Sequence, residues 1–265
     1  MPPDLAFTPD SPCVARLAPS PNFGPRRFAP GGAARLDMLV LHYTGMAGAD
    51  AAIALLQDPA AEVSCHYVVR EDGTVVQMVA EAQRAWHAGR SCWEGIADIN
   101  SRSIGIEIVN GGHDFGLPDF PPAQVAAVIA LCADILARHA IRADRVVAHS
   151  DIAPARKRDP GERFPWDLLH DAGIGHWVAP APDAPGPCLG PGDAGEAVQR
   201  LKADLAAYGY AVPGGAAYDA DLELVVAAFQ RHFRPARVDG IADPATCATL
   251  RALIAARPAD ASLIA

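Results

Sequence analysis

The sequence predicts an α/β protein, with a mixed central β-sheet and flanking helices, followed by a small C-terminal three-helix domain. Apolar runs of strand length recur along the first 150 residues, and helical patterns alternate with them, which predicts the sheet and its helices. Beyond the Pro/Ala-rich segment 178–187 the sequence pattern changes from alternating strands and helices to short amphipathic helices, which are joined by Gly, Pro and Asp turns.

The individual elements follow from apolar periodicity and turn residues. Residues 1–34 are rich in Pro, Gly and Ala and predict an extended arm. The expected strands are 36–43, 63–70, 74–79, 103–109 and 145–149, with a hairpin turn at Glu71-Asp72-Gly73. The expected helices are 50–56, 121–139, 166–172, 196–208, 222–233 and 246–255.

Domain boundaries follow from the same changes in composition. We expect the arm over 1–34, an α/β domain over 35–177, a semi-rigid linker over 178–187 and the helical domain over 188–265. A chain of 265 residues is long enough to bury a sizeable core in this arrangement.

Charge and composition argue against several classes of partner. A net charge of −9 disfavours nucleic acid and anionic membrane surfaces. No apolar run is long enough to span a bilayer, and the N-terminus lacks the basic start and apolar core of a secretory signal. The six cysteines are scattered without a CxxC pair, so free, mostly buried thiols are favoured over disulfides. We expect a cytoplasmic protein, with the periplasm as the alternative, and a monomer.

Segment 146–166 (VVAHSDIAPARKRDPGERFPW) carries a group of polar side chains behind a predicted strand. Its prolines rule out a long helix, so His149, Lys157 and Asp159 are expected on a rigid loop. His42 ends another buried strand, and both imidazoles emerge at one edge of the sheet if the two strands are neighbours. Two histidines and a carboxylate, with a fourth position open, are the ligands of a catalytic zinc site. Ordinary core or surface positions for the histidines are the alternative.

Two further side chains have the chemistry to act beside such a metal. Glu107 stands between Ile106 and Ile108 in a strand, where burial without a partner is costly, so we expect it to face a cleft. There a carboxylate can accept a proton and return it to a leaving amine. Lys157 can stabilise the oxyanion that forms when a carbonyl is attacked. The alternatives are a structural ion pair for Glu107 and a solvated surface position for Lys157.

The other candidate residues are Trp86 and His87, which we expect to line the cleft, with Trp86 as an apolar platform for a sugar or peptide. The alternative is that they only cover the core. We expect structural hydrogen bonding for His66, and surface or helix-dipole positions for His139 and His170. Three histidines carry no signal: His113, His176 and His232.

Taken together, several motifs resemble the zinc N-acetylmuramoyl-L-alanine amidases of the type-2 amidase family, which is related to the peptidoglycan-recognition proteins. They run in order as LHYT at 41–44, SCHYVV at 64–69, the DG turn, AWHAG at 85–89, SIGIEIVN at 103–110 and VVAHSDIAPARKRDPGERFPW at 146–166. The last run is highly specific and most resembles the AmiD type of this family.

The resemblance implies one zinc ion per chain, held by His42, His149 and Asp159, with Glu107 as general base and Lys157 stabilising the tetrahedral intermediate. It implies hydrolysis of the amide between the lactyl group of N-acetylmuramic acid, or of its 1,6-anhydro form, and L-alanine of the stem peptide. The implied partners are peptidoglycan or soluble muropeptides.

Two readings compete with the enzyme. A peptidoglycan receptor on the same fold binds without cleaving, but family members that only bind typically lack one zinc ligand, and here all three are present. A purely structural metal site is the other reading, and an open coordination position would count against it.

Residues 188–265 resemble the three-helix peptidoglycan-binding domain. The match rests on LGPGDAGEAVQRLKADLAAYGY, AAFQRHF and VDGIADPATCATL. Asp243 stands where that family usually has Gly, and Lys202 where Gln is common. The resemblance implies binding to the cell wall, and a small helical stabilising domain is the alternative.

Overall fold

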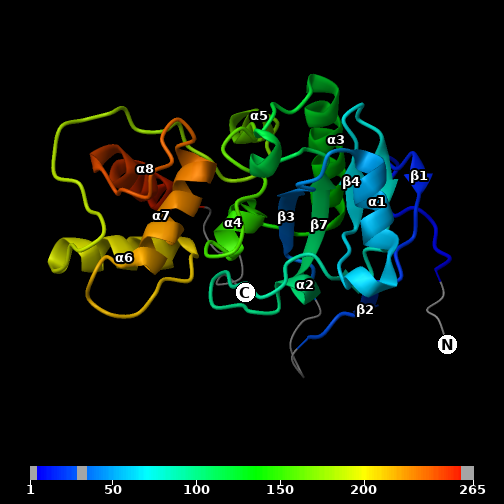
Figure 1. Ribbon diagram of the computed structural model, residues 1–265, viewed down its shortest axis with the longest axis horizontal. Coiled ribbons are helices and arrows are strands. Elements are labelled where there is room, and N and C mark those ends of the chain that lie inside the picture. Colours follow the sequence, from blue (N-terminus) through cyan, green and yellow to red (C-terminus); the bar gives the residue numbers. More distant parts are fainter. Residues whose placement is uncertain (1–4, 29–34, 258–265) are drawn as a thin grey trace.

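The computed structural model describes residues 5–28 and 35–257 and has one sheet at its centre (Figure 1). Parts of the predicted arm, 1–4 and 29–34, lie outside the described residues, as does the end of the helical region at 258–265.

Six strands form the central sheet in the order β1-β5-β4-β7-β3-β8. The four strands β4, β7, β3 and β8 run parallel, β5 is antiparallel to β4, and β1 is parallel to β5, so the sheet is mixed as predicted. The strands are β1 (Arg16–Leu17), β3 (Met38–Tyr43), β4 (Tyr67–Val69), β5 (Val75–Gln77), β7 (Ser103–Ile108) and β8 (Val146–Ala148). A separate antiparallel pair consists of β2 (Phe23–Pro25) and β6 (Gln83–Ala85).

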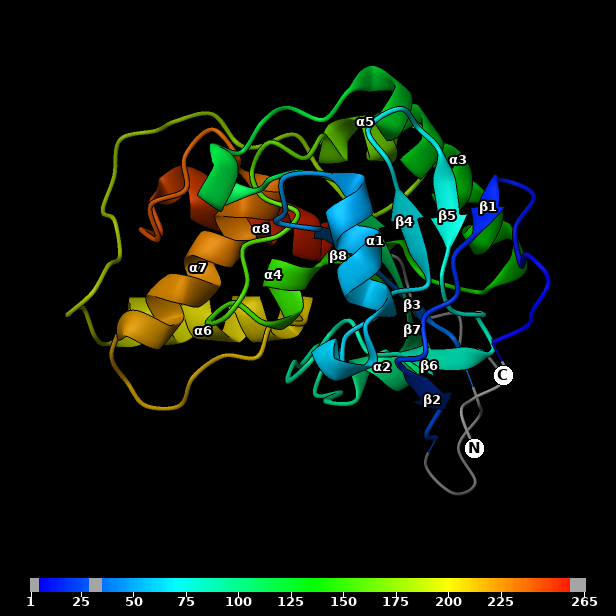
Figure 2. The same ribbon diagram turned by 45° about the vertical axis from the view of Figure 1, so that its right-hand side comes forward.

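Helices flank the sheet and then continue as a separate group toward the C-terminus (Figures 1 and 2). In the first part they are α1 (Ala49–Gln57), α2 (Ile99–Arg102), α3 (Pro122–Arg138), α4 (His149–Ile152) and α5 (Trp166–Asp171). The C-terminal three are α6 (Glu196–Tyr208), α7 (Ala220–Phe233) and α8 (Pro244–Ala255). Short 3₁₀ turns lie at η1 (Pro59–Ala61), η2 (His113–Phe115) and η3 (Ala143–Arg145). Among the described helices, none is long and apolar enough to cross a membrane.

The two faces of the sheet bury different helices, and this decides where the site lies. Leu39 and Leu41 of β3 share a core with the apolar stripe of α3. Met38 and Val40 alternate to the opposite face, where they share a core with α6 and α7. His42 has the same parity as Met38 and Val40, so its side chain emerges on that opposite face. Helix α1 covers the neighbouring part of the same face, over β4 and β5.

The C-terminal helices are built into the core of the molecule. Val147 of β8 and Val40 of β3 lie in one continuous apolar cluster with Leu201, Val226 and Phe229 of α6 and α7. Figure 1 shows α4 between α7 and β3, at the junction of the two regions. Removing the helices would therefore expose apolar surface of the sheet to water.

The two departures from the usual pattern of the helical region have local structural roles. Asp243 caps α8, because its carboxylate accepts a hydrogen bond of 2.8 Å from the backbone N–H of Thr246. The Lys202 ammonium is buried and donates to backbone carbonyls of the 213–215 turn. Both side chains stabilise the fold of this region.

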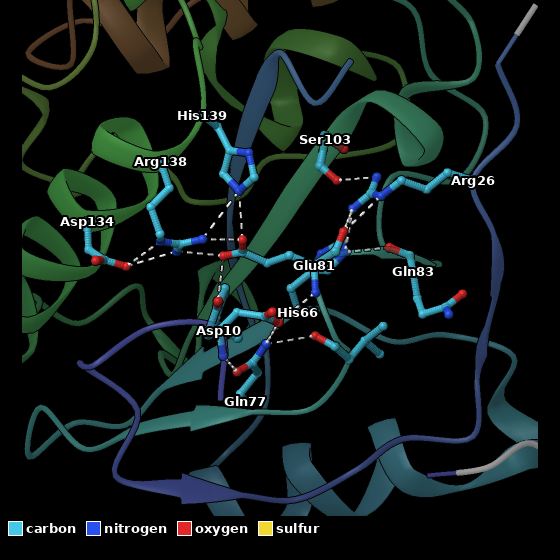
Figure 3. A network of polar contacts seen from close by, with 12 residues as sticks. Asp10, Arg26, His66, Gln77, Glu81, Gln83, Ser103, Asp134, Arg138 and His139 are labelled. Carbon is cyan, nitrogen blue, oxygen red and sulfur yellow. Dashed lines mark hydrogen bonds and ion pairs between the residues drawn. The ribbon is translucent and has the colours of Figure 1, made fainter. Parts of the chain in front are cut away.

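The N-terminal arm is held by a polar network around Glu81 (Figure 3). The Glu81 carboxylate accepts hydrogen bonds from Tyr67 at 2.6 Å and from Arg138 at the end of α3, and its backbone N–H donates to Asp10 of the arm. Arg26 of the arm donates to the Glu81 carbonyl. Although burial raises the pKa of Glu81, hydrogen bonds from Arg138 and Tyr67 outweigh this and lower that pKa to about 2.

Several local expectations need correction. The strand expected over 63–70 begins only at Tyr67, and the strand expected over 145–149 ends at Ala148, where the chain turns into α4. Asp151 causes this turn by accepting a hydrogen bond of 2.8 Å from the backbone N–H of Ala148. The arm contributes strands β1 and β2, and β6 is a further short strand that the sequence did not predict. All six cysteines are free as predicted, although only Cys65 and Cys132 are buried.

Candidate metal centre and cleft

His42, His149 and Asp159 meet at one point because β3 and β8 are neighbours in the sheet. His42 is near the end of β3, and His149 directly follows β8, whose residues pair with β3 from Leu39 to Leu41. The loop after α4 then returns, since the Ser150 N–H donates to the Asp159 carbonyl at 3.0 Å. The three residues are buried, and the sequence prediction that they converge is borne out.

One ligand atom from each residue faces the same spot. The Nδ1 atoms of His42 and His149 are 2.8 Å apart, and Asp159 Oδ2 lies 3.1 Å from the first and 2.9 Å from the second. Two imidazole nitrogens and one carboxylate oxygen match the three protein ligands of a catalytic zinc site. The donor set and its convergence therefore fit a zinc ion.

The protonation states also suit a metal. Burial, with electrostatic repulsion from the neighbouring His149 imidazole, lowers the pKa of His42 to about 4, so the His42 imidazole is neutral at pH 7. Burial alone would raise the pKa of Asp159, but its charge and hydrogen-bond interactions with His149 and His42 hold it well below the usual range. Metal binding requires these forms, a neutral imidazole and an ionised carboxylate.

A chain of hydrogen bonds sets which nitrogen of His42 is free for a ligand. The Ser103 hydroxyl donates to the Ile99 carbonyl at 2.7 Å, so its oxygen accepts from His87 Nε2, 3.1 Å away. His87 Nδ1 is then an acceptor, and His42 Nε2, at 3.0 Å, donates to it. The lone pair of His42 Nδ1 is thereby directed at the metal position.

His149 is set in the same way by a backbone group. Its Nε2 lies 3.2 Å from the carbonyl oxygen of Ala88 and donates to it, so in the neutral imidazole Nδ1 is the nitrogen with the free lone pair. The AWHAG motif thus supports both histidines, through the side chain of His87 and the carbonyl of Ala88.

Glu107 lies beside this cluster, since it pairs with His42 in the register of β7 and β3. Its Oε2 is buried and has no hydrogen-bond partner among the residues that the structure describes. Burial, reinforced by the charge of Asp159, raises the pKa of Glu107 well above its usual value, and Lys157 opposes the shift. A carboxyl of this kind is available to a substrate and easily protonated.

A cleft of about 250 Å³ opens above these groups. Glu107, Lys157 and the three ligand-bearing segments form its polar side, and Leu55 and Leu56 of α1 form an apolar wall. Trp86 and His87 line it as well. The contact of His87 with His42 was not expected from the sequence, because a pairing across 45 residues leaves no local pattern.

The remaining histidines lie outside the ligand cluster. His66 accepts a hydrogen bond from the Gly105 N–H at 2.9 Å, as expected for a structural residue. His139 is half-buried and bonds to Glu81, whereas His170 is exposed as predicted. His232, which carried no signal in the sequence, is buried against Asp151, two residues after His149.

Comparison with known proteins gives the site a family. Residues 32–162 match the family described as N-acetylmuramoyl-L-alanine amidase, and residues 194–250 match a putative peptidoglycan binding domain. The chain is 40% identical over 246 residues to N-acetylmuramoyl-L-alanine amidase AmiD of Escherichia coli K12, and the match covers 86% of each chain.

Two solved structures are similar over most of their length. One is the complex of AmiD from E. coli with the substrate anhydro-N-acetylmuramic acid-L-Ala-D-γ-Glu-L-Lys, at 39% identity and a TM-score of 0.73, covering 87% of this chain and 93% of that one. The other is AmpDh3 from Pseudomonas aeruginosa in complex with anhydromuramic pentapeptide, at 34% identity and a TM-score of 0.71, covering 85% and 94%. On these grounds the chain belongs to the N-acetylmuramoyl-L-alanine amidase family.

Proposed function

We propose that this protein hydrolyses the amide bond between N-acetylmuramic acid, or its 1,6-anhydro form, and L-alanine of the stem peptide, using one zinc ion held by His42, His149 and Asp159. Membership of the amidase family supports the reaction. The observation that carries the metal assignment is the convergence of the Nδ1 atoms of His42 and His149 and one carboxylate oxygen of Asp159. A zinc ion there supplies Lewis acidity to water and to the amide carbonyl.

Glu107 is the proposed general base. Its raised pKa brings the carboxylate closer in basicity to neutral pH, where accepting a proton from water and delivering it to the leaving amine are both efficient. Oε2 is free of hydrogen bonds within the described part of the chain, so a lone pair is available to a water in the cleft.

Lys157 is the proposed partner for the negative charge that develops on the carbonyl oxygen. It lines the same cleft. Its positive charge is near enough to oppose the rise in the pKa of Glu107 and to contribute to the lowered pKa of His42. A fixed cation in a water-poor cleft stabilises a developing oxyanion more strongly than a solvated one.

Trp86 and His87 are assigned different roles. Trp86 is half-buried in the cleft wall and offers an apolar face to a sugar ring or peptide. Both ring nitrogens of His87 already bond within the protein, to His42 and Ser103. We therefore propose that His87 orients His42 and makes no polar contact with substrate through its ring nitrogens.

The compartment and the oligomeric state are separate parts of the proposal. Six free thiols favour a reducing compartment, so we propose the cytoplasm and soluble muropeptides as the first substrate to test, with a monomeric enzyme. Cell fractionation and light scattering of the purified protein measure these two points. A protein found in the periplasm would favour intact peptidoglycan instead.

The test is product analysis by mass spectrometry. The protein is mixed with purified 1,6-anhydro muropeptide and, separately, with intact sacculi, each with and without a chelator. We expect free stem peptide that disappears with the chelator. His149→Ala should lose zinc and turnover together, whereas His170→Ala, at an exposed histidine, should keep both. Stoichiometric zinc without release from either substrate would contradict the enzyme and favour a receptor.

A further inference from the structure

A buried carboxylate joins the segment of His149 to the C-terminal helices. Asp151 of α4 has no exposed surface and accepts three hydrogen bonds. One comes from the Ala148 N–H at 2.8 Å, and the others cross between the two regions, from Tyr210 Oη at 2.7 Å and His232 Nδ1 at 2.7 Å. A buried carboxyl group bonded to this many fixed partners is held in one orientation.

Both partners of Asp151 are themselves rigidly held. The imidazole of His232 is stacked between Trp166 of α5 and Phe233, with ring centroids 3.7 Å and 3.8 Å away. The ring of Tyr210 packs edge-on against Trp93, with centroids 5.0 Å apart. The donors therefore reach Asp151 from fixed positions.

Helix α4 cannot hold His149 by itself. It is four residues long, and one helical turn has no stability of its own in water. His149 is its first residue and Asp151 its third, so an anchor on Asp151 limits how α4 can rotate and where the His149 imidazole points. Helix α7 packs directly against α4, as Figure 1 shows.

We propose that Tyr210 and His232 are positioning residues of the metal centre, so that the C-terminal helical region orients a zinc ligand as well as completing the core. The inference rests on the proposed metal site of His42, His149 and Asp159. It gives the helical region a part in the reaction that is independent of any binding to the cell wall.

The experiment removes the two side-chain donors to Asp151 while keeping an aromatic ring at each position. Tyr210→Phe removes the hydroxyl that bonds Asp151, and His232→Phe keeps a stacking ring without the donor. The matched control is Tyr218→Phe, because the Tyr218 hydroxyl is also buried and donates to a carbonyl, that of Gly240, inside the helical region. His232→Asn restores an N–H donor close to the position of Nδ1.

The readouts are zinc affinity of the full-length protein by chelator competition, the visible spectrum of the cobalt-substituted protein, and kcat/KM. We expect Tyr210→Phe and His232→Phe to bind zinc about tenfold more weakly and to shift the cobalt bands, in line with the usual effect of groups that support metal ligands. Tyr218→Phe should change neither, at a similar loss of thermal stability, and His232→Asn should recover most of the affinity.

Unchanged zinc affinity and cobalt spectra in both Tyr210→Phe and His232→Phe would overturn the proposal and leave Asp151 as a structural link between the regions. If His232→Phe does not fold, Tyr210→Phe decides the matter alone, since it keeps the ring and its packing. Absence of zinc from the wild-type protein is a different outcome. It would contradict the proposed metal site itself, and the inference that rests on that site with it.

Discussion

At the scale of single residues, environment gives two carboxylates of one site opposite properties. Asp159 interacts with two histidines and stays ionised, whereas the neighbouring Glu107 is buried with an unpartnered oxygen, which raises its pKa well above normal. Two acidic groups whose surroundings push their pKa values apart can take different roles, one as ligand and one as proton carrier.

Replacing Glu107 by Gln should separate these roles. The amide cannot accept the proton, so we expect kcat to fall by about 10²–10⁴-fold while bound zinc stays at one per chain. Metal analysis and steady-state kinetics measure the two quantities. Glu71→Gln, at an exposed turn, is the control and should behave as wild type. Retention of full activity in Glu107→Gln would refute the assignment.

A second residue-scale effect concerns Glu81, whose pKa of about 2 lies below its ordinary value of 4.5. Because the folded-state pKa is the lower one, Glu81 contributes stability that is complete above about pH 4.5 and is lost as the pH falls toward 2.

Glu81→Gln should therefore lower the free energy of unfolding at pH 6 and lose less of it than wild type between pH 4.5 and pH 2. Urea unfolding at several pH values gives the free energy of unfolding of both proteins. Protonation of His42, His149 and Asp159 affects both equally, so it drops out of the difference between them. Parallel pH profiles would show that the network around Glu81 does not stabilise the arm.

At the scale of elements, the parts that could be predicted from sequence are those with long periodic signals. The strands at 36–43 and 103–109, the helix at 121–139 and the three C-terminal helices lie within a few residues of their predicted bounds. Strands β1, β2 and β6 have two or three residues each, too few for a periodic pattern. They form by pairing with a neighbouring strand, β1 with β5 and β2 with β6. The His42, His149 and Asp159 cluster was predictable because His42 and His149 lie at or just after strand ends and Asp159 follows on the Pro-rich loop. The contacts of His87 and His232 depend on packing across distant segments.

Strand β7 contains one position where the backbone must approach a ring closely. A Cβ on Gly105 would lie 2.4 Å from Cγ of His87. Gly105→Ala should push His87 away from His42, costing about 1–3 kcal/mol of stability and weakening zinc binding. Gly24→Ala in β2 is the control, since its Cβ would meet nothing within 4 Å. Chemical unfolding and zinc competition measure both effects, and equal behaviour of the two variants would contradict this account.

At the scale of the whole molecule, sheet and C-terminal helices share one apolar core, so the two regions should unfold together. Ion pairs add to the junction, where Arg257 contacts both Glu94 and Asp144. Residues 194–250 match a family of their own, yet in this protein their helices pack against the sheet in one continuous, buried apolar cluster.

Phe229→Ala tests this cooperativity. Phe229 is fully buried in the shared core, so the change should cost about 3–5 kcal/mol and lower the melting temperature of the entire protein in one transition. Differential scanning calorimetry measures it, with Phe115→Ala, at a side chain 56% exposed, as the control. Two separate transitions, of which only one shifts, would contradict a common core.

The order along the chain of the three proposed ligands, His42, His149 and Asp159, has a consequence for biosynthesis. His42 leaves the ribosome 107 residues before its partner His149, and Asp151 must wait a further 81 residues for His232. Since nascent chains fold from the N-terminus onward, β3 forms without β8 beside it and the metal pocket closes late. If the pocket binds zinc as proposed, zinc would load only after most of the chain is made, and a chain that stalls within the last helices would carry an amidase domain whose His149 segment is not yet anchored to Tyr210 and His232.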